Sequence, residues 1–187
     1  MNILNLYASL NGQTEKVAVE IEKAVTEGGH AVTTVNVKKN GAVIDLLAYD
    51  LTFIGSGVYT WLPGKAMLSW IENQMSYARQ NDLILPGSPM IHGKFACVYC
   101  TYAGPHTGVD EAVPAIKYMG QLFAHHGITV ADEWSIPGAF VPEKMWHYNT
   151  SGRLGNIEGR PNSEDLRQVR EKTKGLISSL LPSFEEV

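Results

Sequence analysis

Three short, nearly continuous apolar runs constrain the fold of this chain more than any other feature of its sequence. They occupy residues 3–7, 51–55 and 95–100. Apolar runs of this length without polar–apolar alternation are typical of parallel strands that are buried on both faces. A helical pattern follows each run, so strands and helices alternate along the chain. This alternation predicts a parallel sheet with helices packed on both of its faces.

The remaining sequence adds two strands, at residues 31–37 and 128–135, and two stretches that fit neither pattern. These irregular stretches are residues 78–93 and 136–160. The second has about 25 residues, which is longer than an ordinary connection, so we expect it to serve a function or an interface. We therefore predict a single domain over residues 1–187 that carries two irregular excursions.

The charge and composition of the chain exclude several classes of protein. Lysine and arginine number 15, aspartate and glutamate number 19, and the net charge is −4 with no basic run. Because phosphate contacts dominate nucleic-acid binding, we expect no nucleic-acid partner. No apolar run approaches the ~20 residues of a membrane-spanning helix, and the first residues lack the regions of a signal peptide. With only two cysteines, the sequence favours a cytoplasmic protein without membrane insertion.

Three loops should meet at one edge of the predicted sheet. In an open parallel sheet, ligands bind beyond the carboxyl ends of the strands, at the point where the strand order reverses. The loops at residues 9–14, 56–61 and 101–108 each leave the carboxyl end of a strand. We therefore expect the functional site among these three loops.

The first of these loops has the composition of a phosphate-binding turn. It opens a helix, and a helix N-terminus offers free backbone N–H groups and a partial positive charge. The hydroxyl groups of Ser9 and Thr14 can add hydrogen bonds, and Gly12 allows the backbone to approach a ligand closely. The loop has no lysine or arginine, so uncharged donors would hold the phosphate. An ordinary capped turn between strand and helix is the alternative.

Several other phosphate-binding and catalytic motifs are absent from the sequence. Gly12 precedes Gln13 rather than the lysine of a P-loop. The glycines around Ser56 lack the third glycine of a dinucleotide-binding fingerprint. Ala103 and His106 stand where a Cys-x5-Arg phosphatase would need arginine. The sequence therefore points to none of these three classes.

Aromatic side chains are concentrated in the second and third loops. Tyr59 and Trp61 lie in the second loop, and Tyr102 lies in the third. Flat side chains beside a phosphate site suggest a flat ring that is joined to the phosphate, since stacking contributes about 1–3 kcal/mol where it has been measured for bases. Half-exposed core aromatics at the edges of the sheet are the alternative interpretation.

With these motifs in place, the sequence resembles the flavodoxin-like flavoprotein family. Residues 9–14 resemble its phosphate loop, and residues 49–59 resemble its segment of Tyr-Asp, apolar strand and Gly-Ser turn. Residues 101–111 resemble the third loop of its tryptophan-repressor-binding-protein-like quinone reductases, with Thr101, Gly104, Gly108 and Glu111 matching. Residues 159–162 resemble the family's segment before the last helix. The resemblance covers most of the chain.

This resemblance implies a flavodoxin-like fold, which is a three-layer α/β/α sandwich around a five-stranded parallel sheet in the order 2-1-3-4-5. It also implies noncovalent binding of FMN, with the phosphate in the first loop and the isoalloxazine ring between the second and third loops. NAD(P)H is a candidate electron donor. The residues expected to bind the cofactor are Ser9, Leu10, Asn11, Gly12, Gln13, Thr14, Gly57, Val58, Tyr59, Thr60, Trp61, Thr101, Tyr102, Ala103, Gly104, His106 and Gly108.

Two pairs of potential metal ligands have structural explanations. Cys97 and Cys100 lie in a predicted strand, where side chains three residues apart point to opposite faces and cannot share a metal or form a disulfide. His125 and His126 end a predicted helix, where cationic side chains stabilise the last carbonyl groups. We therefore expect no metal site.

Aromatic residues also flank the long excursion. Trp134, Trp146 and Tyr148 lie before or within it. We expect them to pack in the core or to form an oligomer contact rather than to cover the flavin. A polar residue ahead of the last helix, Asn162, is expected to cap that helix.

Three functions are compatible with this sequence. The first is a redox enzyme that passes electrons from NAD(P)H or a protein donor to a quinone-like acceptor. The second is an electron carrier that docks to redox proteins, and the third is a flavin-free binding or scaffold domain. Electron carriers of this family tend to be strongly acidic, whereas this chain has a net charge of −4, which favours the enzyme. Its partner would be a small molecule or a redox protein, a homo-oligomer is left open, and no catalytic side chain is assigned.

Overall fold

A parallel sheet forms the centre of the structure, a computed structural model that describes residues 1–184. The strand order is β2-β1-β3-β5-β6, with β4 paired to the end of β3. The strands are β1 (Asn2–Ala8), β2 (Ala31–Asn36), β3 (Leu51–Tyr59), β4 (Leu62–Pro63), β5 (Phe95–Tyr102) and β6 (Thr129–Pro137). The α-helices are α1 (Gln13–Glu27), α2 (Lys65–Gln80), α3 (Val113–His125), α4 (Tyr148–Ser151) and α5 (Ser163–Leu180). The prediction of a three-layer sandwich with this order of parallel strands is confirmed.

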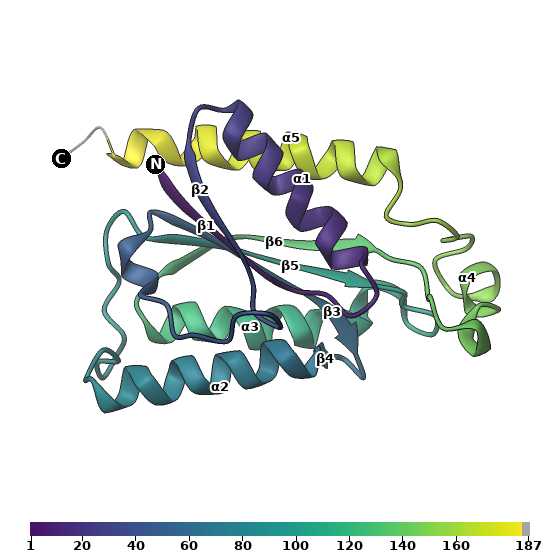
Figure 1. The fold of residues 1–187 in the computed structure, drawn as a ribbon, viewed down its shortest axis with the longest axis horizontal. Coiled ribbons are helices and arrows are strands. Elements are labelled where there is room, and N and C mark those ends of the chain that lie inside the picture. The colour runs from purple at the N-terminus through teal and green to yellow at the C-terminus, as the bar shows by residue number, and fades with distance from the viewer. Residues whose placement is uncertain (185–187) are drawn as a thin grey trace.

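Helices cover both faces of the sheet. Figure 1 shows α1 and α5 on one face and α2 and α3 on the other. Each face has its own core, with Phe53 and Trp134 under α1 and α5 and with Ile54 and Trp70 on the opposite face. Neighbouring residues of β3 therefore belong to different cores because successive side chains of a strand point to opposite faces. This two-sided burial explains the unbroken apolar runs in the sequence.

The second loop is shorter than the sequence predicted. Ser56 and Gly57 pair with Cys100 and Thr101 of β5, so β3 continues to Tyr59 where a loop was expected to begin at residue 56. The chain then turns back into β4, which pairs antiparallel with β3. The missed hairpin has no Asn-Gly or Asp-Gly signal, the usual sequence mark of such turns.

The first irregular excursion is shorter than predicted, and the second has the predicted length but begins and ends two residues later. Helix α2 runs on to Gln80, and β6 runs on to Pro137. The second excursion contains a 3₁₀ turn, Glu143–Met145, and the short helix α4. The irregular connections are therefore residues 81–94 and 138–162.

Gly55 has a packing role that the sequence did not reveal. A Cβ atom built at this position would lie 2.0 Å from ring atoms of Tyr99, which is fully buried. The glycine therefore lets the Tyr99 ring lie flat against β3. The phenol of Tyr99 in turn donates a hydrogen bond to Asn5 Oδ1 at 3.4 Å inside the sheet.

The local expectations for cysteines, histidines and the last helix are confirmed. Cys97 and Cys100 are buried in different cores. His125 and His126 each contact the carbonyl oxygen four residues earlier through Nδ1, both at 2.7 Å. The side chain of Asn162 caps α5 in a reciprocal capping box with Asp165. None of the helices within residues 1–184 combines the length and the apolar character needed to span a membrane.

Candidate functional site

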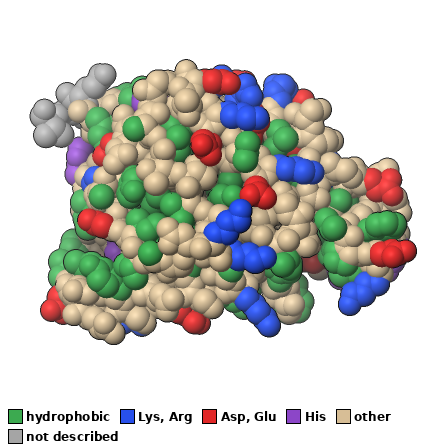
Figure 2. All heavy atoms as spheres, in the orientation of Figure 1, with side chains coloured by type: hydrophobic (Ala, Val, Ile, Leu, Met, Phe, Trp, Pro, Cys, Tyr) green, Lys and Arg blue, Asp and Glu red, His purple; other side chains and the backbone are tan. Residues whose placement is uncertain are grey.

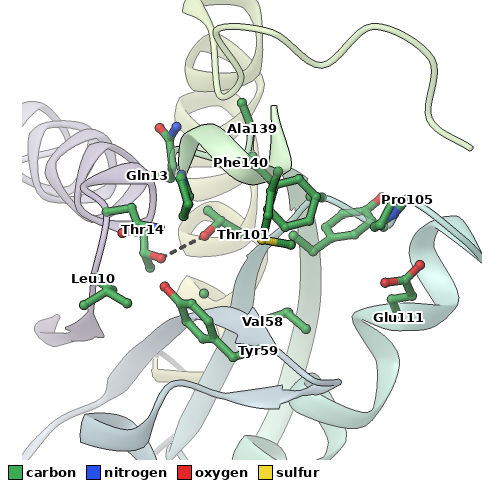
Figure 3. Close-up of a pocket in the computed structure, with 18 of the residues that line it drawn as sticks. Leu10, Gln13, Thr14, Val58, Tyr59, Thr101, Pro105, Glu111, Ala139 and Phe140 are labelled. Atoms are coloured by element: carbon green, nitrogen blue, oxygen red, sulfur yellow. Dashed lines mark hydrogen bonds between the residues drawn. The ribbon is translucent and has the colours of Figure 1, made fainter. Parts of the chain in front are cut away.

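A cleft of about 590 Å³ lies at the carboxyl ends of the strands. The three predicted loops all contribute to it, and the segment after β6 adds a fourth side. Figure 3 shows Val58 and Tyr59 on one side of the cleft and Ala139 and Phe140 on the other. The volume is within the range of about 300–1,000 Å³ that is usual for small-molecule sites.

The first loop presents unused hydrogen-bonding groups at the N-terminus of α1. Gly12 is the N-cap residue with a φ of 82°, and no side chain caps this end of the helix. The hydroxyl oxygen of Ser9 is buried without a hydrogen-bond partner. An unpaired buried hydroxyl is costly unless a ligand or water satisfies it. Free first-turn amides beside a spare hydroxyl make a site that suits an anion.

A hydrogen bond between two side chains joins the first and third loops. The hydroxyl groups of Thr14 and Thr101 are 2.8 Å apart, and both residues are buried. Figure 3 draws this bond at the centre of the cleft. The bond uses the Thr14 hydroxyl, which the sequence assigned to the phosphate. Either hydroxyl can be the donor of this bond, so Thr14 keeps its proton for a ligand when Thr101 donates. Ser9 is the hydroxyl of this loop that has no partner within the protein.

The second loop is a tight hairpin with two strained residues at its tip. Thr60 and Trp61 both have positive φ values, 49° and 65°. Such conformations cost roughly 1–2 kcal/mol for a residue with a side chain. Trp61 remains 57% exposed at the mouth of the cleft, whereas burial raises the pKa of the Tyr59 phenol, which therefore keeps its proton at neutral pH. The hairpin offers two aromatic faces and one hydroxyl group.

The third loop is held in shape by Glu111 and two glycines. One carboxylate oxygen of Glu111 accepts hydrogen bonds from the backbone N–H groups of His106 at 2.7 Å and Thr107 at 2.9 Å. A Cβ at Gly104 would lie 2.5 Å from the carbonyl oxygen of Gly108, and both glycines have positive φ. These interactions fold the loop into a compact turn beside β5.

The structure brings the predicted site residues together with two exceptions. All of the residues predicted to bind the cofactor line the cleft except Gly12 and Gly108, which shape the first and third loops through their backbones. The sequence did not identify seven further lining residues, which are Pro105, Glu111, Gly138, Ala139, Phe140, Pro142 and Met145. Five of them, Gly138 to Met145, follow β6, and their position after the carboxyl end of a strand was the available signal.

The aromatic residues around the long excursion differ in their burial and packing. Trp134 is fully buried, with its ring centroid 5.7 Å from that of Phe53, so the packing expectation holds for it. Tyr148 packs 5.5 Å from His106 and 5.8 Å from Phe140, just behind the cleft. Trp146 is 55% exposed on the outside of this segment.

Comparisons with known proteins agree with this architecture. Residues 4–96 match the model of a flavodoxin domain family. Among solved structures, flavodoxin 1 from Bacillus cereus is 14% identical, with a TM-score of 0.66 over 95% of this chain and 98% of that one. A flavodoxin from the domain Archaea is 14% identical, with a TM-score of 0.63 over 96% and 99% of the two chains.

A third solved structure represents another branch of the same fold. It is a flavodoxin, WrbA-like protein from Agrobacterium tumefaciens, 12% identical, with a TM-score of 0.61 over 97% of this chain and 98% of that one. A search of curated protein sequences gave no match. At these identities the solved structures establish the fold.

Proposed function

Because this chain belongs to the flavodoxin-like family, we propose that its cleft binds FMN noncovalently and that the protein transfers electrons. The observation that carries this proposal is the buried, unpartnered hydroxyl of Ser9 at the uncapped N-terminus of α1. A phosphate monoester would satisfy this hydroxyl and the first-turn amides together. No lysine or arginine lines the cleft within residues 1–184, so uncharged donors would hold the phosphate.

The remaining lining residues suit a flat ring system. Tyr59 and Trp61 supply aromatic faces from the hairpin, and Phe140 supplies one from the segment after β6. FMN, when bound, supplies reversible transfer of one or two electrons. The protein would orient the ring between these side chains, and Phe140 would restrict water on one side. The protonated phenol of Tyr59 would be available as a hydrogen-bond donor.

The finer proposal is an oxidoreductase that moves electrons from NAD(P)H or a protein donor to a quinone-like acceptor. The apolar residues that line the cleft support an enzyme with a small-molecule acceptor. An electron carrier that docks to proteins needs no pocket for an acceptor. An electron carrier without its own substrate is the second candidate, and the exposed Trp61 at the mouth of the cleft favours it as a docking contact. We further propose one domain and a cytoplasmic location, since unpaired buried cysteines are typical of that compartment.

Ser9→Ala tests the phosphate site directly. The Ser9 hydroxyl makes no hydrogen bond within the protein, so the variant should keep its thermal stability. Its affinity for FMN should fall by about ten- to a hundredfold, because a bond to a charged group contributes about 1.5–3 kcal/mol. Titration of the apoprotein with FMN, followed by the quenching of FMN fluorescence, measures this change in affinity. Unchanged affinity would refute the placement of the phosphate.

A matched pair at Gly12 isolates the charge of the ligand. Asp and Asn have nearly the same shape, both tolerate positive φ, and open space surrounds this position. Gly12→Asp should weaken FMN binding sharply relative to Gly12→Asn, since only the aspartate repels a phosphate.

Turnover of the holoprotein with NADH or NADPH and a quinone would then separate the enzyme from the carrier.

A further inference from the structure

The outer face of α2 carries an acid and a base that are both unpaired. Glu72 and Arg79 are exposed, and neither forms a salt bridge within residues 1–184. They lie two turns apart on the same side of the helix, whereas residues that pair within one helix are three or four positions apart. Figure 1 shows α2 along the lower edge of the molecule, beside α3. Both charges are therefore available to another molecule.

An open hollow lies between these two charges. It has a volume of about 390 Å³ and is lined by Ile71, Glu72, Met75, Ser76 and Arg79 of α2 and by Tyr118 of α3. Met75 and Tyr118 are only half-buried, so apolar atoms at the centre of the hollow reach the solvent. An apolar centre with charged groups at its margin is the usual composition of a protein–protein contact.

The order of the charges along α2 makes this face complementary to itself. In a two-fold dimer the same patch meets its own copy, so each residue of a contacting pair occurs once on either side. The midpoint between residues 72 and 79 falls between Met75 and Ser76. If two copies of α2 pack antiparallel about a two-fold axis at this midpoint, Glu72 of each copy lies opposite Arg79 of the other. A parallel pair would instead bring like charges together.

We infer that α2 is the contact surface of a reversible homodimer, in which the α2 helices of two copies of this chain pack antiparallel. Two salt bridges between Glu72 and Arg79 flank a centre formed by Met75 and Ser76 of both copies. The second copy also fills the hollow beside Tyr118. One helix pair covers less than the ~800 Å² per partner of a standard stable interface. We therefore expect a dissociation constant in the micromolar range.

The dimer leaves both FMN clefts open. Helix α2 begins at the carboxyl edge of the sheet, just after β4, so antiparallel pairing points the two clefts in opposite directions. None of the residues around the hollow lines the cleft. Dimer formation is therefore independent of FMN binding, and substitutions on this face should leave the affinity for FMN unchanged.

Sedimentation velocity of the full chain measures the dimer directly. Between about 1 and 300 µM the protein should shift from monomer to dimer. Glu72→Arg should raise the dissociation constant at least about tenfold, because it opposes two cations on each side of the axis. Glu158→Arg is the matched control, since Glu158 is also exposed without a salt bridge in the described residues and lies far along the chain from α2. A protein that stays monomeric throughout, or an equal response to both substitutions, would overturn the inference.

A mixture of two variants tests the antiparallel pairing. Arg79→Glu alone should weaken the dimer, as Glu72→Arg does. An equimolar mixture of the two should dimerise again, because the two introduced charges then face each other and so do the two native ones. Arg79 also lies in the last turn of α2, where a cation stabilises the helix, so thermal denaturation should show a small loss in Arg79→Glu. Mixing cannot repair a folding defect, and a mixture that stays monomeric would exclude this arrangement.

A disulfide across the axis tests the geometry without relying on charge. Ser76 is exposed beside the proposed axis, so Ser76→Cys should form a covalent dimer on oxidation, visible by non-reducing electrophoresis. Ser69→Cys is the control, because Ser69 is also exposed on α2 but its two copies would lie about 20 Å apart along the helices. The native cysteines, Cys97 and Cys100, are buried and do not compete. Equal cross-linking of the two variants, or none in Ser76→Cys, would contradict the proposed axis.

Discussion

The two irregular connections differ in what they do for the molecule. The amino-end connection, residues 81–94, joins α2 to β5, and the carboxyl-end connection, residues 138–162, joins β6 to α5. Figure 1 shows them at opposite ends of the sheet, and Figure 2 shows hydrophobic side chains on the surface at both ends. Only the carboxyl-end connection lines the cleft.

The difference follows from the direction of the strands. All strand-to-helix connections of a parallel sheet gather at the carboxyl ends, and the helix-to-strand connections gather at the other edge. The amino-end connection therefore packs against the end of α3, where Ile91 N–H donates to the Gly127 carbonyl at 2.8 Å. Irregular sequence and exposed apolar side chains occur in both connections, so neither property by itself marks a functional segment.

Gly127→Ala should have the largest effect on stability and none on the cleft. Gly127 has a φ of 71°, and a Cβ there would lie 2.2 Å from the carbonyl oxygen of Pro89. Overpacking and left-handed backbone together should lower the free energy of unfolding by about 3 kcal/mol. Thermal denaturation measures the loss. FMN affinity of the folded protein should be unchanged, and a tenfold weaker affinity would contradict the division between the two connections.

Asn149→Ala should have a smaller effect on stability and a clear effect on the cleft. It leaves two backbone groups of Phe140 without partners, which should lower the free energy of unfolding by about 2 kcal/mol. Hydrogen exchange at the Phe140 amide should accelerate, and FMN should bind more weakly, because Phe140 lines the cleft. Asn81→Ala is the control, because the Asn81 side chain also bonds a backbone carbonyl, that of Tyr77 at 2.8 Å, but is exposed in the amino-end connection. Equal effects of Asn149→Ala and Asn81→Ala on stability and on binding would contradict the difference between the two connections.

Two methionines offer a milder version of the same comparison. Met145 lines the cleft, whereas Met90 is 77% exposed in the amino-end connection. Met145→Ser should weaken binding of FMN by a few-fold, roughly the effect of losing 1 kcal/mol of apolar contact. Met90→Ser should change neither ligand affinity nor stability by more than about 0.5 kcal/mol. Calorimetry and thermal denaturation check both values.

The smallest effect is the absence of a reaction, and it is expected for the two cysteines of the sheet between the two connections. Cys97 and Cys100 lie in β5, and burial raises the pKa of Cys100 to about 12. Neither thiol should react with a disulfide reagent at pH 8 in the native protein. Because an unfolded thiol ionises near its ordinary pKa and the buried one stays neutral, Cys100 contributes stability that is lost as the pH rises from about 9 toward 12. Rapid labelling at pH 8 would show that the core opens.

The candidate site was predictable in part. The first loop and the third loop were located correctly because each follows an apolar strand, and the Thr101 and Gly104 positions carried a recognisable pattern. The hairpin at Thr60 and Trp61 was missed, since its turn has residues that rarely adopt positive φ. Phe140 was missed as well, because its position depends on Asn149, nine residues later in an irregular segment.

The sequence by itself determined the layered fold, because burial on both faces requires unbroken apolar strands and one-sided helices, and these patterns are local. The composition of the first loop also indicated, from the sequence alone, a turn suited to binding a phosphate. Only the tertiary structure decided which connection completes the cleft, which hydroxyl remains unpaired, and why Gly55 must lack a side chain. These outcomes depend on contacts between segments far apart in the chain, such as Thr14 with Thr101 and Gly55 with Tyr99, and no local pattern encodes such contacts.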